Sequence, residues 1–77
     1  MKRMVFHLMP KKDGRWLLQL NGRHVAILDT KTGALREGKV RCQAAARLGV
    51  VAQLMLHDEN GNFEIHSSYG DELQSAN

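Results

Sequence analysis

Apolar residues fall along this chain in short runs that are separated by turn signals. Such runs, bounded by Gly, Pro, Asn and Asp, are typical of strands that pair through hairpins. The predicted strands cover residues 4–9, 16–20, 25–28, 51–56 and 63–67. Tight turns are marked by Asp13-Gly14, Asn21-Gly22 and Asn60-Gly61. The pattern therefore predicts hairpins before and after the central part of the chain.

The central part predicts a helix from about Lys31 to Leu48. Asp29-Thr30 provides an N-cap oxygen for the first-turn amides, and Gly49 stands where a left-handed C-cap residue belongs. At about 100° per residue, one arc of this helix collects mainly small side chains. They are Ala34, Leu35, Gly38, Cys42, Ala45, Ala46 and Gly49. Such a helix can lie close on a sheet but adds little apolar bulk.

The bulk of the core must then come from the strands. The expected core residues are Phe6, Leu8, Trp16, Leu18, Ile27, Leu54, Leu56, Phe63 and Ile65. Two hairpins flanking a helix predict an α+β fold of two layers, with an antiparallel sheet of four or five strands. The expected order is strand, strand, short strand, helix, strand, strand. One domain is expected over residues 1–70, with a loose tail at 71–77.

The strand positions that alternate with the core positions are not consistently polar. They are Val5, His7, Met9, Leu17, Gln19, Val51, Gln53, Met55 and His57. One helix covers one face of a sheet, so the other face would expose an apolar patch to water. We therefore expect a homodimer through Val5, Met9, Leu17, Val51 and Met55. Pairing through the open edge of the strand at 25–28 is a rival route to a dimer.

Composition limits the alternatives. Seventy-seven residues make one small domain, and Cys42, the single cysteine, excludes an intramolecular disulfide. We interpret Cys42 as a packing residue. The four histidines lie far apart without a Cys-x-x-Cys pair, so no metal and no cofactor are expected. No run reaches the about 18 apolar residues that span a bilayer. A cytoplasmic protein without a membrane partner is expected.

Charge is distributed unevenly between the two parts of the chain. All eleven Lys and Arg residues lie between Lys2 and Arg47, whereas the last thirty residues hold five acids and no base. A stripe on the predicted helix collects Arg36, Lys39, Gln43 and Arg47. This arrangement suits a phosphate backbone, although an ordinary solvated helix face has the same pattern. The hairpin residues Lys11, Lys12 and Arg15 would extend the stripe if they lay on the same side.

His7 and His57 are the best candidates for acid–base chemistry. Asp58 and Glu64 are the carboxylates near in sequence, and a histidine at a strand end is more often satisfied at the surface. We therefore do not expect an enzyme, and a small histidine-dependent hydrolase or ribonuclease is a remote alternative. Tyr69 is expected to fold back against the sheet rather than to stack on a base.

Several short motifs, each present once, follow one another along the chain. They are His7-x-x-Pro10, Asp13-Gly14 before Trp16, Asp29-Thr30-Lys31 with Ala34, His57-x-x-x-Gly61 and Ser68-Tyr69-Gly70. In this the chain resembles the small bacterial proteins grouped as domain of unknown function 2188, over about residues 5–71. It departs from them at Arg15, which separates Gly14 from Trp16, and in lacking a proline after the Tyr-Gly motif. The resemblance implies the fold and a bacterial origin. It brings no established activity, so it leaves the function open.

The function expected from the sequence is that of a non-enzymatic interaction module that associates with itself. The alternative is a sequence-nonspecific nucleic-acid-binding accessory module that uses the basic helix stripe.

Overall fold

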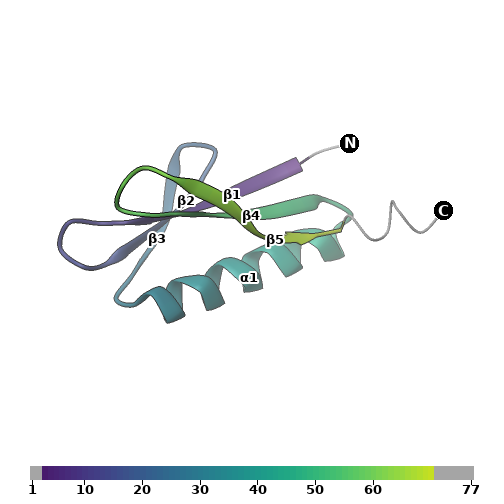
Figure 1. Ribbon diagram of the computed structural model, residues 1–77. Coiled ribbons are helices and arrows are strands. Elements are labelled where there is room, and N and C mark those ends of the chain that lie inside the picture. The colour runs from purple at the N-terminus through teal and green to yellow at the C-terminus, as the bar shows by residue number, and fades with distance from the viewer. Residues whose placement is uncertain (1–2, 71–77) are drawn as a thin grey trace.

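Five strands and one helix make up the chain in the computed structural model, which describes residues 3–70. The elements are β1 (Arg3–Pro10), β2 (Trp16–Leu20), β3 (Arg23–Leu28), α1 (Lys31–Arg47), β4 (Val51–His57) and β5 (Phe63–Tyr69). The helix lies along one side of the sheet and forms the second layer (Figure 1). The α+β class and the order of elements are confirmed. The tail expected at residues 71–77 lies outside the described residues.

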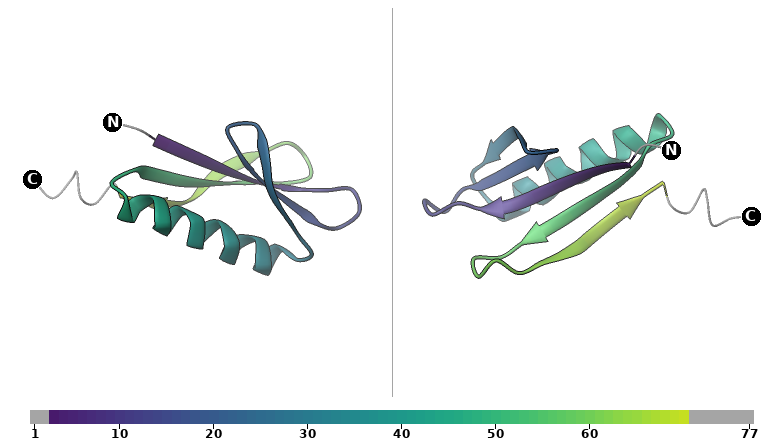
Figure 2. Two further views of the ribbon diagram at one scale, coloured as in Figure 1. Left: turned by 180° about the vertical axis from the view of Figure 1, so that it is seen from behind. Right: turned by 90° about the horizontal axis from the view of Figure 1, so that it is seen from above.

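The sheet has the order β3-β2-β1-β4-β5 and is mixed. β1 pairs with β4 in parallel, whereas the other neighbouring strands are antiparallel. The prediction of an antiparallel sheet is therefore wrong for this central pair. The reason is the path of α1: the helix carries the chain back along the sheet, so β4 enters at the same end as β1. Parallel neighbours need such a long crossover, and Figure 2 shows β1 and β4 running side by side.

Local turn and cap signals place the ends of the elements. Asn21 and Gly22 both have positive φ, 53° and 81°, as the tight turn between β2 and β3 requires. Thr30 is the N-cap of α1, and its Oγ1 accepts a hydrogen bond of 3.0 Å from the Gly33 amide. The helix ends within one residue of the predicted position.

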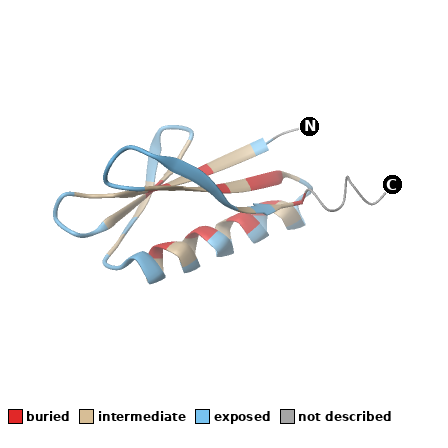
Figure 3. Cartoon of the chain, in the orientation of Figure 1, coloured by how far each residue is buried: buried red, intermediate tan, exposed pale blue. Residues whose placement is uncertain are grey.

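The core lies between α1 and the facing side of the sheet. The buried strand residues there are Phe6, Leu8, Leu18, Ala52 and Leu54, and the buried helix residues are Ala34, Gly38, Cys42 and Ala45. Figure 3 shows this buried seam where the helix faces the sheet. Trp16, Leu56 and Tyr69 pack against it from its margins. The packing predicted for Cys42 and Tyr69 is thereby confirmed.

Three residues predicted for the core lie elsewhere. Ile27, Phe63 and Ile65 are 46%, 61% and 56% exposed. The sheet register explains the difference, because Ile65 stands opposite Met55 and Phe63 opposite His57, on the face away from the helix. A register shift within β5 then turns Tyr69 to the helix side. Such a bulge reverses the facing of every later residue.

The helix approaches the sheet closely at Gly38. A Cβ atom there would lie 2.8 Å from Cδ1 of Leu54, which is itself fully buried. In an exposed helix interior, Gly→Ala stabilises by up to about 1 kcal/mol. Here we expect Gly38→Ala to destabilise instead, by roughly 1–2 kcal/mol, because the added methyl overpacks the core. Urea unfolding followed by circular dichroism measures the change.

A second variant tests the cause. Adding Leu54→Val to Gly38→Ala removes volume at the contact and should recover part of the lost stability. If Gly38→Ala proves stabilising, the close approach does not limit the packing of the helix.

Candidate functional site

The sheet face opposite α1, called here the open face, carries the residues predicted for self-association. Val5, Met9, Leu17, Val51 and Met55 all lie on it, since they alternate with the buried residues of their strands. Met9 stands opposite Leu17 across β1 and β2. Four of the five are half-buried, whereas Val51 is 5% exposed, so a second copy would bury little more of Val51.

Sequence reasoning missed three further residues of the open face. Ile27 on β3 and Phe63 and Ile65 on β5 extend the apolar surface to both edges of the sheet. A signal for two of them was available: residues that flank a hairpin turn and pair with each other share a face. The pair formed by His57 and Phe63 across the turn at Asn60-Gly61 places β5 in this way.

The open face is almost free of formal charge. Among the strand residues that the structure describes there, Arg3 at the start of β1 is the only one with a permanent charge. The polar members are Gln19, Gln53, Ser68 and histidines. Glu64 of β5 stands opposite Leu56 and therefore lies on the helix side. The described part of the open face is thus apolar and nearly uncharged, and depletion of charge is also found at the centres of protein interfaces.

His7 and His57 meet on this face although fifty residues separate them. Nδ1 of His7 lies 2.9 Å from Nε2 of His57, so one ring donates a hydrogen bond to the other. The ring of His57 also stacks on Phe63, with 5.2 Å between ring centroids. Burial, and then the neighbouring His57, lowers the pKa of His7 below its ordinary value.

The carboxylates considered as partners for these histidines are occupied or turned away. Oδ1 of Asp58 accepts hydrogen bonds of 2.9 Å from the amides of Asn60 and Asn62. These bonds close the turn between β4 and β5 and lower the pKa of Asp58. Within the described residues, the rings of His7 and His57 form their hydrogen bond with each other. The two rings form a hydrogen-bonded pair, and within the described residues no carboxylate is bonded to either ring to orient a catalytic base.

The basic stripe lies on the opposite side of the molecule. Arg36, Lys39, Gln43 and Arg47 are all exposed on α1, on the arc turned away from the buried helix residues. Within residues 3–70, the ion pairs formed are Arg41 with Glu37 and Arg15 with Asp13, so the three cations of the stripe are unpaired. Arg15, proposed as an extension of the stripe, forms its ion pair with Asp13 of the same hairpin.

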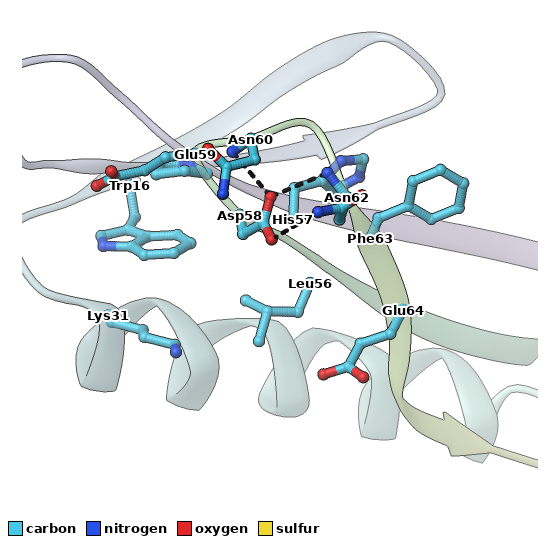
Figure 4. Close-up of a pocket in the computed structure, with 11 residues that line it drawn as sticks. Trp16, Lys31, Leu56, His57, Asp58, Glu59, Asn60, Asn62, Phe63 and Glu64 are labelled. Atoms are coloured by element: carbon cyan, nitrogen blue, oxygen red, sulfur yellow. Dashed lines mark hydrogen bonds between the residues drawn. The ribbon is translucent and has the colours of Figure 1, made fainter.

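A cleft lies on the helix side, between the turn of β4 and β5 and the start of α1. It has a volume of about 570 Å³ and is lined by Trp16, Lys31, Leu56 and Glu64, together with the turn residues (Figure 4). The ammonium of Lys31 lies 5.9 Å from the centroid of the Trp16 ring, in cation–π distance. The sequence contained no signal for this cleft, because residues from five separate elements, β1, β2, α1, β4 and β5, line it.

Comparison with known proteins adds no relative. No protein-family model, curated protein or solved structure matches the chain. Within the described residues, no three His, Cys, Asp or Glu side chains converge to hold a metal ion, and no helix is long and apolar enough to cross a membrane.

The side chain of Cys42, the single cysteine, is fully buried in the core. Burial raises the pKa of its thiol to about 11. The thiolate is the reactive form. We therefore expect a disulfide reagent at about pH 8 to label folded protein at least about tenfold more slowly than protein in guanidinium. Release of the reagent's chromophore measures both rates. Equal rates would contradict the buried position of Cys42.

Proposed function

We propose that the protein is a self-associating interaction module, in which the open face of one chain packs against the open face of a second copy. The observation that carries the proposal is the uncovered apolar face, which reaches from β3 to β5 and has one permanent charge. Monomeric proteins seldom leave apolar patches of more than a few hundred Å² in water. A sheet face without charge is suited to another sheet face, as in β-sandwiches.

The size of the core supports the same proposal. Helix α1 contributes mainly small side chains to the core, and the largest fully buried side chains are Leu8, Leu18, Leu54 and Cys42. A chain of this length buries only about 60% of its unfolded surface, so its stability is small. Covering the open face would bury ~600 Å² per chain, at the low end of specific interfaces. Association then also stabilises the fold.

Pairing between sheet edges is a different route to the same dimer. β3 and β5 are the edge strands, and each presents unpaired backbone groups on its outer side. The two routes respond differently to a charge placed on the open face, because edge pairing leaves that face in water.

Met55→Lys distinguishes them, since Met55 lies on β4 among the apolar residues of the open face. We expect wild-type protein at about 100 µM to have the mass of a dimer in light scattering, and Met55→Lys to have the mass of a monomer. Val40→Lys is the matched control, because Val40 is 55% exposed on α1 and its variant should remain dimeric.

Circular dichroism shows whether each variant is folded. A dimer that persists in folded Met55→Lys supports edge pairing and contradicts packing of the open faces. A wild-type monomer at this concentration contradicts both routes to self-association.

A second candidate function is sequence-nonspecific binding of nucleic acid through α1. The observation that favours it is the row of unpaired cations at Arg36, Lys39 and Arg47. Over the eleven residue steps from Arg36 to Arg47 the helix rises about 16 Å, which spaces the three charges to follow a phosphate backbone. Three of the six acids in residues 3–70 lie at the other end of the chain, on β5 and the turn before it, and Glu37 on α1 is paired with Arg41.

This binding should weaken with salt. Neutralising three to five phosphates gives a log–log slope of about −3 to −4, measured by fluorescence anisotropy with a labelled duplex. We expect Arg36→Glu combined with Arg47→Glu to abolish it. The control is Lys12→Glu with Arg23→Glu, which changes net charge equally at exposed positions outside α1. Equal losses in both double variants, or no binding at about 50 mM salt, would reject the helix as the binding surface.

A further inference from the structure

The His7–His57 pair lies on the face that self-association would cover, between β1 and β4. We propose, as an extension of the proposed self-association, that protonation of this pair separates the two copies, so that the protein associates at neutral pH and dissociates in mild acid. The pair then regulates the same surface that the proposed function uses.

The hydrogen bond between the two rings limits how many protons they can bind while they stay in contact. With 2.9 Å between Nδ1 of His7 and Nε2 of His57, a single proton occupies the space between them. A neutral imidazole has one donor and one acceptor nitrogen, whereas an imidazolium has two donors. If both rings are protonated, two N–H groups and two positive charges face each other, and the rings must separate.

Within residues 3–70, neither ring of the pair forms an ion pair with a carboxylate. On its own face, His7 stands opposite Gln19 of β2 and Met55 of β4, and His57 stacks on Phe63 of β5. The titratable groups on the surrounding elements are Arg3 on β1, Lys11 after it, Arg23 and His24 on β3, Asp58 and the exposed Glu59 after β4, and Glu64, His66 and Tyr69 on β5. The carboxylate of Asp58 closes its turn, Glu64 is on the helix side, and His66 shares a hydrogen bond with Ser67.

Even in the single chain this environment disfavours the charged form. The pKa of His7 is lowered first by burial and then by His57, and no carboxylate raises it. A second copy would remove the remaining water, which is the only solvent for an imidazolium on this face. The dimer would then bind fewer protons than two separate chains.

The sign of the pH effect follows from this difference. When the dissociated form binds more protons, lowering the pH favours dissociation. One proton taken up per chain makes the dimer dissociation constant rise by up to about a hundredfold per pH unit once the pH is below the histidine pKa of the separate chain. Between about pH 7.5 and pH 5.5 we expect a rise of roughly 10–100-fold, in a range where carboxylates keep most of their charge.

Sedimentation equilibrium of the whole chain at these two pH values tests the proposal. The test variants are His7→Gln and His57→Gln, because glutamine stays neutral and can still form hydrogen bonds. Each should reduce the change in dissociation constant to less than about threefold. The control is His66→Gln, since His66 is exposed and bonded to Ser67, and this variant should keep the full pH response of the wild type.

Each outcome separates this inference from the proposed function. A wild-type dimer with the same dissociation constant at both pH values overturns the pH switch and leaves self-association standing. A monomer at both pH values overturns self-association and the switch together. A pH response that survives in both glutamine variants places the proton uptake elsewhere and overturns the role of the pair.

If the glutamine variants do not associate at neutral pH, their dissociation constants at the two pH values cannot be compared. In that case, NMR titration of the His7 and His57 rings replaces it, in wild-type dimer and in monomeric Met55→Lys. Lower pKa values in the dimer support the proposal, and equal values overturn it.

Discussion

One helix has to cover a five-stranded sheet, and it can cover only one side. This constraint organises the rest of the molecule. Helix α1 lies against β1 and β4, the parallel pair at the centre of the sheet, where Gly38 meets the side chain of Leu54. The small residues along the helix allow that approach, and the large residues of the strands fill the space. The other side of the sheet remains outside the core.

The two sides of the molecule consequently have different chemistry. The helix side is polar and cationic on its outer surface, because α1 turns its charged arc away from the sheet. The open face is apolar and nearly uncharged, and it holds the His7–His57 pair. Apolar area favours association with a like surface, whereas unpaired cations favour a polyanion. The two proposed functions therefore use separate surfaces, and a dimer through the open face leaves both basic stripes exposed.

Histidine is the one residue type on the open face whose charge changes near neutral pH. A pair of histidines in contact is more sensitive than a single ring, because the first proton can be shared and the second cannot. The parallel pairing of β1 and β4 is what brings the rings together, since it sets His7 beside the end of β4. The same pairing that anchors the helix thus also creates the contact between two histidines on the opposite face.

Local structure could be predicted from the sequence, because its causes are local. The turn at Asn21-Gly22, the cap at Thr30 and the small-residue arc of the helix follow from backbone preferences and side-chain periodicity within a few residues. The helix stripe and the five predicted interface positions follow from the same periodicities.

Tertiary structure alone decided that β4 lies beside β1, because periodicity within a strand does not name its neighbour. It also placed the bulge in β5, so that Tyr69 faces the core although Phe63 and Ile65 of the same strand face outward. The contact between His7 and His57 depends on pairing across fifty residues. Nothing in the local sequence records such a contact, because only the complete sheet brings the two strands together.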